Sequence, residues 1–100
     1  MGYNRNKVWN KVIQCSDTEY LFNGKRVARF VNIQVVALRK LAMLNRAEKP
    51  EDLRIPPNNK LEQLKRARVG QWSIRINDQW RVCFRFEGGH AYDVEIVDYH

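Results

Sequence analysis

The 100-residue sequence predicts an α+β fold, in which a long helix packs on a sheet built from the last third of the chain. The helix is predicted over residues 32–45, where apolar residues recur at the spacing of one helix face. The sheet is predicted from the alternation of apolar and polar residues over residues 71–76, 79–86 and 92–97. A chain of this length can bury one modest core, so we expect a single domain over residues 1–100.

The two helices expected before the sheet carry different signals. Over residues 16–22, Ser16 and Glu19 fit a capping box at the start, and Gly24 ends the segment as a C′ residue does. The long helix has an apolar stripe made of Ile33, Val36, Ala37, Leu41 and Leu44, widened by Leu38 and Ala42. The polar residues expected off this stripe, on a solvated face, are Gln34, Arg39, Lys40 and Arg46.

The remaining segments give weaker signals. Residues 1–6 are expected to fray, and residues 7–13 to form a short strand. A single helical turn is predicted over residues 50–53, and the prolines that follow favour an ordered loop. Residues 60–65 fit either a helical turn or a bulged strand, and both readings stay open.

The register of the predicted hairpin follows from the requirement that its apolar faces agree. A three-residue loop over residues 77–79 puts Arg75 opposite Arg81, whereas a two-residue loop would put it opposite Trp80. The first register keeps the large apolar groups on the helix-covered side, which are Trp72, Ile74, Ile76, Trp80, Val82, Phe84 and Phe86, with Tyr92, Val94 and Ile96. The other side carries Arg75, Arg81 and Arg85, whose repulsion calls for anionic partners, either Asp93 and Glu95 or the phosphate of a ligand.

Charge and composition narrow the function classes. A net charge of +7 favours a nucleic acid or an acidic protein as partner, although a basic solvated surface is the simpler reading. The residues before Cys15 include several cations and lack the apolar stretch of a signal peptide, so we expect a cytoplasmic protein with reduced thiols. No stretch is apolar enough for a membrane span, and Cys15, Cys83, His90 and His100 lack the spacing of metal ligands. We expect no metal and no cofactor.

Long segments of the chain resemble one known family. Residues 70–86 read G-Q-W-S-I-R-I-N-D-Q-W-R-V-C-F-R-F, and residues 93–100 read D-V-E-I-V-D-Y-H. Further matching segments are C-S-D-T-E-Y-L-F, A-L-R-K-L-A-M-L and P-P-N-N-K-L-E-Q-L-K. Together they resemble the HigB toxins, or plasmid maintenance killer proteins, of the RelE/ParE superfamily. The resemblance covers roughly residues 11–100.

This resemblance implies both a fold and an activity. The implied fold is a compact α+β RelE-like domain, with two N-terminal helices packed on a mostly antiparallel sheet. The implied activity is that of a ribosome-dependent endoribonuclease, an mRNA interferase that cuts mRNA in the ribosomal A site. The implied partners are the ribosome with its mRNA and a HigA-like helix-turn-helix antitoxin, through which the toxin would meet operator DNA.

Metal-free RNA cleavage by the 2′-OH needs a base near that hydroxyl, cations on the phosphate and an acid for the 5′-oxygen. Asp98, Tyr99 and His100 match the family's C-terminal motif, and His100 could transfer a proton while Asp98 orients it or acts as base. Tyr99 could stack on a base or bind the phosphate, and Glu62 is a second candidate base. Cations to bind phosphate are available from Lys65, Arg66, Arg68, Arg75, Arg81 and Arg85.

Two alternatives compete with this reading. The chain could be a toxin-fold protein without nuclease activity, either a ParE-like gyrase inhibitor or a degenerate toxin that binds only the antitoxin and its operator complex. Residues 98–100 could be a plain strand end, and Arg75 and Arg81 could be ordinary cross-strand ion-pair residues. At residues 66–67 the chain has Arg-Ala where family members commonly have Gly-Asp, which makes this segment more basic.

Overall fold

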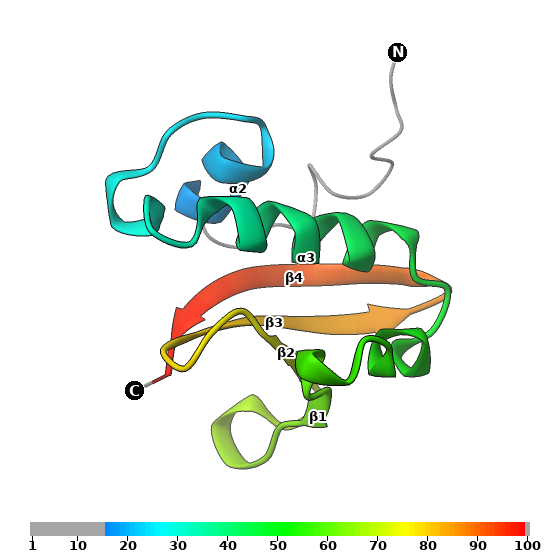
Figure 1. The fold of residues 1–100 in the computed structure, drawn as a ribbon. Helices are drawn as coiled ribbons and strands as arrows, with labels where there is room; N and C mark the ends of the chain where they lie inside the picture. Colours follow the sequence, from blue (N-terminus) through cyan, green and yellow to red (C-terminus); the bar gives the residue numbers. More distant parts are fainter. Residues whose placement is uncertain (1–15, 100) are drawn as a thin grey trace.

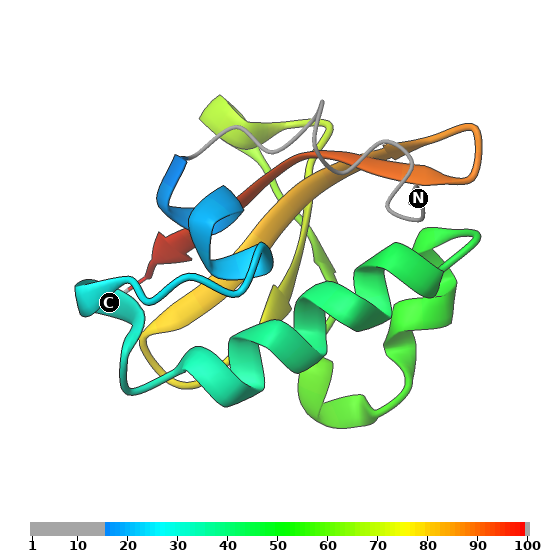
Figure 2. The ribbon, with the colours of Figure 1, turned by 90° about the horizontal axis from the view of Figure 1, so that it is seen from above.

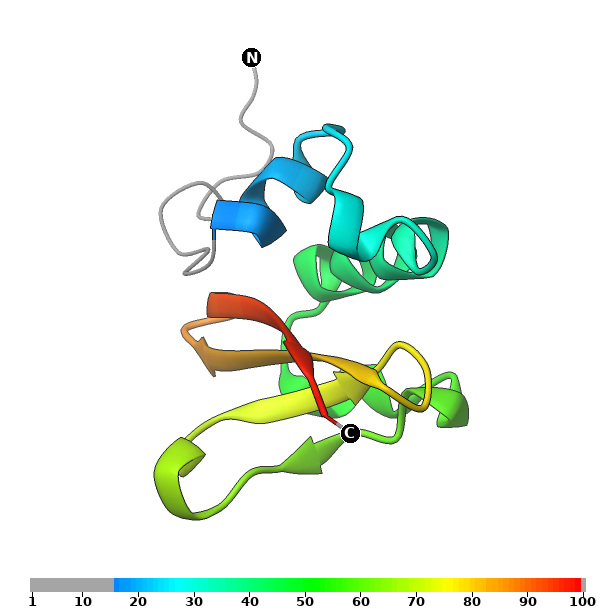
Figure 3. The ribbon, with the colours of Figure 1, turned by 90° about the vertical axis from the view of Figure 1, so that its left-hand side faces the viewer.

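The computed structural model describes residues 16–99, in which helices cover one face of a four-stranded antiparallel sheet (Figure 1). The strands β1 (Glu62–Gln63), β2 (Trp72–Arg75), β3 (Trp80–Glu87) and β4 (His90–Asp98) lie in chain order. Helices α2 (Ser16–Phe22) and α3 (Gln34–Arg46) lie on the same side of the sheet, as the edge-on view of Figure 3 shows. The predicted α+β fold is confirmed. The predictions for residues 1–6, residues 7–13, Cys15 and His100 lie outside the described residues.

Short 3₁₀ helices complete the connections. They are η1 (Ala28–Phe30), η2 (Pro50–Arg54), η3 (Pro57–Asn59) and η4 (Arg66–Arg68). The predicted helical turn at residues 50–53 therefore exists as η2, with Pro50 at its start. The open question at residues 60–65 resolves as the short strand β1, in which Glu62 pairs with Ser73 and Gln63 with Trp72. Within residues 16–99, no helix combines the length and the apolar character that a membrane span requires.

Helix α2 ends at the predicted glycine and reaches the sheet through one buried hydroxyl. Gly24 has φ +86°, its N–H donates to the Leu21 carbonyl, and the Lys25 N–H donates to the Tyr20 carbonyl. This pair of bonds is the Schellman arrangement, which favours glycine because its φ is positive. On the inner side of the helix, the fully buried Thr18 Oγ1 accepts a hydrogen bond of 3.1 Å from the Ile96 N–H of β4.

Helix α3 runs along β3 and β4 rather than across them (Figure 1 and Figure 2), and its apolar face supplies much of the helix-side core. Ile33, Ala37, Leu41 and Leu44 are buried as predicted, and each buried leucine contributes about 1.5–3 kcal/mol by removal from water. The prediction that Lys40 lies on the solvated face is wrong, because its side chain is only 7% exposed. A fixed hydrogen-bond acceptor at the end of η3 lets this ammonium group enter the protein, as described below.

The hairpin of β2 and β3 has the predicted register and the predicted three-residue loop. Arg75 lies opposite Arg81, and the Ile76 N–H donates to the Trp80 carbonyl across the loop. The Asn77 side-chain oxygen accepts hydrogen bonds from the N–H groups of Gln79 and Trp80, which closes the turn. Ile74, Val82 and Phe84 are fully buried beneath the helices, and the Trp80 ring meets Phe30 edge to face at 5.4 Å between centroids.

Strand β4 departs from the predicted alternation at one residue. Cys83 pairs with Glu95 and Arg85 pairs with Tyr92, so two β4 residues stand against the single residue Phe84. This is a β-bulge, and Asp93 within it has φ +54°, a conformation that Asp tolerates better than most residues. The bulge reverses the parity of the strand, so the predicted placement of Tyr92 beside Val94 and Ile96 is wrong. Ala91 takes the buried position instead.

Candidate functional site

The site is built on the open face, by which we mean the sheet face turned away from α2 and α3. Directly opposite residues in antiparallel strands point to the same face. The pairings therefore align one row across all four strands, which consists of Glu62, Ser73, Cys83 and Glu95. The neighbouring row consists of Arg75, Arg81 and Val97. The predicted meeting of Arg75, Arg81 and Arg85 on one face follows from the same register.

Arg81 is the most firmly held cation of this face. Its Nε donates to Ser73 Oγ at 2.8 Å, and its Nη2 donates to the Lys60 carbonyl at 2.6 Å. The Glu62 carboxylate lies 4.0 Å from Nη2, and the side chain of Arg81 is only 13% exposed. Neutral acceptors thus fix the plane of the guanidinium, while its Nη1 forms no hydrogen bond or ion pair among residues 16–99.

Beneath Arg81 the open face has a buried polar floor. Ser73 and Cys83 are both fully buried although they point away from the helices. Burial raises the pKa of the Cys83 thiol, Glu95 raises it further, and Arg68, Arg81 and a hydrogen bond from Tyr99 oppose the rise. The Cys83 thiol is free. The Tyr99 ring lies 5.8 Å from the Arg81 guanidinium carbon, so tyrosine and arginine together cover this floor.

The other arginines of the open face already have carboxylate partners. Arg68 Nη2 lies 3.5 Å from Glu95, and Arg85 Nε lies 3.4 Å from Asp93. Arg75 pairs with Asp78 in the hairpin loop. Asp93 pairs with Arg85, as predicted, whereas Glu95 pairs with Arg68, and neither carboxylate pairs with Arg75 or Arg81.

The segment between β1 and β2 holds the exposed cations. Lys65 and Arg66 are exposed, and neither has an ion pair within the described part of the chain. Arg66 has φ +60°. At this position the toxins that the chain resembles commonly have glycine, which adopts this conformation without strain. The additional arginine of this chain therefore stands at a tight turn with its charge toward solvent.

The two described residues of the C-terminal motif point to different faces. Asp98 lies opposite Trp80, which belongs to the helix-covered side, and accepts a hydrogen bond of 3.1 Å from Gln79 Nε2. Tyr99 lies on the open face with Arg81. This division follows from strand alternation. His100, the third member, lies outside the described residues.

The structure therefore gathers only part of the predicted site. Glu62, Arg68, Arg81 and Tyr99 surround one position on the open face. Burial raises the pKa of the Tyr99 hydroxyl, and the charges of Glu62, Arg68 and Arg81 all act on it. Sequence reasoning missed Ser73 and the Lys60 carbonyl, which hold Arg81. Alternation already put Ser73 on the side of Arg75, whereas no side-chain pattern reports a backbone carbonyl.

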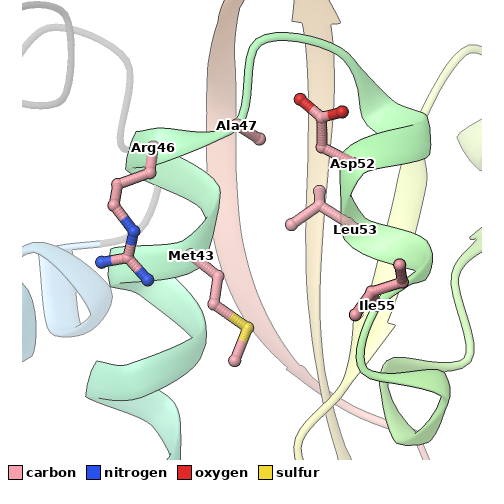
Figure 4. A pocket seen from close by; sticks show the side chains of 6 residues that line it. All are labelled: Met43, Arg46, Ala47, Asp52, Leu53 and Ile55. Atoms are coloured by element: carbon pink, nitrogen blue, oxygen red, sulfur yellow. The ribbon is translucent and has the colours of Figure 1, made fainter.

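A hollow of about 210 Å³ lies elsewhere, between the end of α3 and η2 (Figure 4). Its lining residues are Met43, Arg46, Ala47, Asp52, Leu53 and Ile55, and none belongs to the open face. Asp52 is already used by the backbone, since its Oδ2 accepts hydrogen bonds from the N–H groups of Glu48 and Lys49. Among residues 16–99, no group of three or more acidic, histidine or cysteine residues is arranged to hold a metal ion.

A four-stranded antiparallel sheet with helices on one face and cations on the other is the architecture of a RelE-like toxin domain. The chain belongs to the HigB-like toxin family, because residues 8–100 match the family described as RelE-like toxin of type II toxin-antitoxin system HigB.

Curated relatives share parts of the chain. Over 60 residues the chain is 42% identical to Toxin HigB-1 of Vibrio cholerae serotype O1, a match that covers 60% of this chain and 63% of that relative. Over 41 residues it is 46% identical to Endoribonuclease HigB of Proteus vulgaris, which covers 41% of this chain and 45% of that relative. The matches thus span less than two thirds of each relative.

Proposed function

We propose that this chain is the toxin of a type II toxin–antitoxin pair and an endoribonuclease that cleaves mRNA in the ribosomal A site. Family membership and the relative named Endoribonuclease HigB support this proposal. The observation that carries it is the oriented guanidinium of Arg81, held by Ser73 and Lys60 beside the carboxylate of Glu62 and the ring of Tyr99.

The proposed reaction needs only groups of the RNA and of the protein. A base takes the proton of the 2′-OH, whose oxygen forms a bond to the adjacent phosphorus. The bond from phosphorus to the 5′-oxygen breaks, and an acid protonates that oxygen. The products are a 2′,3′-cyclic phosphate and a 5′-hydroxyl end. Cations beside the non-bridging oxygens stabilise the negative charge that accumulates in the transition state.

We assign roles by position. The Nη1 group of Arg81 would bind the scissile phosphate, and Glu62, whose Oε1 lies 4.0 Å from Arg81 Nη2, would act as the base. Tyr99 would stack on a base of the RNA. His100 would be the acid because it matches the C-terminal motif of the family rather than because of a described position, with Asp98 as the alternative proton-transfer group. Lys65, Arg66 and Arg68 would contact flanking phosphates, with Arg75 and Arg85 at the margin of the bound strand.

We further propose that a HigA-like helix-turn-helix antitoxin neutralises the chain, and that the chain meets operator DNA only through that antitoxin. The membership of the chain in a type II toxin–antitoxin family supports a dedicated antitoxin partner. Its site of action would be the cytoplasm, because translating ribosomes are there.

The deciding experiment maps cleavage of mRNA in ribosome complexes with the wild type, Arg81→Met, Glu62→Gln and His100→Ala. We expect Arg81→Met to lower the cleavage rate by about 100-fold or more, the typical cost of losing one preorganised donor. Arg39→Met is the matched control, because Arg39 is an exposed arginine of α3 on the other side of the sheet. Growth arrest with intact mRNA would instead support a toxin that acts by protein binding.

A further inference from the structure

Asn59 occupies a fully buried position between the helix layer and the sheet. Its Oδ1 accepts a hydrogen bond from the ammonium group of Lys40. Its Nδ2 donates to the Leu53 carbonyl at 3.0 Å and contacts Met43 Sδ at 3.7 Å. The backbone N–H of Asn59 donates to the Pro56 carbonyl at 3.0 Å. One amide side chain therefore joins α3, η2 and η3.

The burial of the Lys40 ammonium group costs free energy. A buried ammonium group loses most of its hydration, and burial lowers the pKa of Lys40, helped by the neighbouring charges of Arg39 and Arg75. A methionine would fill the same space without this cost. Among residues 16–99, the one hydrogen-bond partner of the Lys40 ammonium group is the Asn59 oxygen, so the buried charge is tied to the orientation of that amide.

The residue that follows Asn59 makes the connection to the site. Lys60 has left-handed backbone angles, φ 48° and ψ 54°, and its N–H donates to the Pro57 carbonyl. Its own carbonyl accepts the 2.6 Å hydrogen bond from Arg81 Nη2. A carbonyl in a left-handed turn keeps its direction only if the residues on both sides are fixed, and Asn59 is the fixed residue on one side.

We infer that Lys40 and Asn59 are positioning residues that aim Arg81 through the Lys60 carbonyl. The inference rests on the proposed function for its meaning in catalysis, since Arg81 is the proposed phosphate ligand. The chain of contacts runs from the interior of the helix layer to the open face, and every link in it is a hydrogen bond or a peptide bond. Neither Lys40 nor Asn59 needs to touch RNA.

The first test measures how firmly the Arg81 guanidinium is held, and it needs no assay of RNA cleavage. The ¹H–¹⁵N signal of Arg81 Nε, assigned by its loss in Arg81→Lys, reports the hydrogen bond to Ser73 and its exchange with solvent. We expect Lys40→Met and Asn59→Ala each to shift this signal and to speed its exchange by about tenfold, while Arg39→Met leaves both unchanged. An unchanged Arg81 signal in a folded Lys40→Met or Asn59→Ala protein overturns the inference.

The second test reads the consequence for cleavage on ribosomes. We expect Lys40→Met to lower kcat by about ten- to a hundredfold with little change in KM, the cost of a misplaced catalytic contact. The double variant Lys40→Met with Arg81→Met should cleave no more slowly than Arg81→Met alone, because Lys40 acts through Arg81. Additive losses would overturn the inference. If even the wild type leaves mRNA intact, the proposed function fails, and the Arg81 signal still decides the positioning.

Discussion

The hydrogen bond between Thr18 and Ile96 offers a sharp test of how α2 holds β4. The Tyr99 N–H donates to the Gln79 carbonyl, and hydrogen-bonded pairs alternate along an antiparallel ladder. The pair of Val82 and Ile96 is therefore non-hydrogen-bonded, and the Ile96 N–H points away from β3 toward Thr18. We predict that Thr18→Val, which keeps the shape and removes the acceptor, destabilises the protein.

The magnitude follows from two opposing effects. A buried N–H left without an acceptor costs about 1–3 kcal/mol. The methyl group that replaces the hydroxyl recovers about 0.8 kcal/mol at most by burial. The net loss is then about 0.2–2 kcal/mol. Each kcal/mol lost lowers Tm by about 4–8 °C in a domain of this size.

Urea denaturation measures the loss, and amide exchange locates it. Thr18→Ser is the matched control, because it keeps the acceptor oxygen and gives up only a methyl group. Thr18→Val should speed exchange of the Ile96 amide beyond the change expected from global stability, whereas Thr18→Ser should not. Equal Ile96 exchange in the two variants would refute the argument that this hydroxyl caps the outer edge of β4.

Two further predictions concern the open face. Gly70 and Gly24 both have left-handed backbone angles, with φ +91° and +86°, so Gly70→Ala and Gly24→Ala should each lower the free energy of unfolding by about 1–2 kcal/mol in urea denaturation. The two sites differ in their surroundings: a Cβ at Gly70 would lie 2.6 Å from Arg85 Nη1, whereas a Cβ at Gly24 would meet open space. Only Gly70→Ala should move Arg85 from Asp93 and shift the Arg85 Nε signal; an unmoved signal contradicts this. Because burial raises the pKa of Cys83 above its ordinary 9.0, the folded state keeps a proton that the unfolded state releases, and stability should fall as pH rises past about 9. Cys83→Ala should flatten that part of the pH–stability curve, and identical curves would contradict the assignment.

Local patterns were sufficient to predict much of the architecture. The pairing of Arg75 with Arg81 followed from the single demand that the apolar faces of two strands agree, because burial penalises any other register. The end of α2 at Gly24 followed from the backbone freedom of glycine. Both features depend on residues that are close in sequence, so the information was present in short windows.

The features that were missed depend on partners far away in the chain. The burial of Lys40 needs a hydrogen-bond acceptor 19 residues later, and the sequence of α3 alone does not predict that acceptor. The bulge at Asp93 inserts one residue into a strand that otherwise alternates, and an aspartate is only a weak signal for it. The separation of Asp98 from Tyr99 could have been predicted, since neighbours in a strand face opposite ways. The family motif drew attention to their adjacency in sequence instead.

The ion pairs of the open face have a consequence for selectivity. Glu95, Asp93 and Asp78 act as internal competitors, since an RNA phosphate that binds Arg68, Arg85 or Arg75 must first displace a carboxylate. Each exchange trades one anion for another and releases few counterions, so the salt dependence of RNA binding should be shallower than the number of arginines suggests. A polyanion that binds nonspecifically to such a face therefore gains little binding free energy. It favours a strand that is already held in place and reaches Arg81, the guanidinium whose Nη1 is uncontested among residues 16–99.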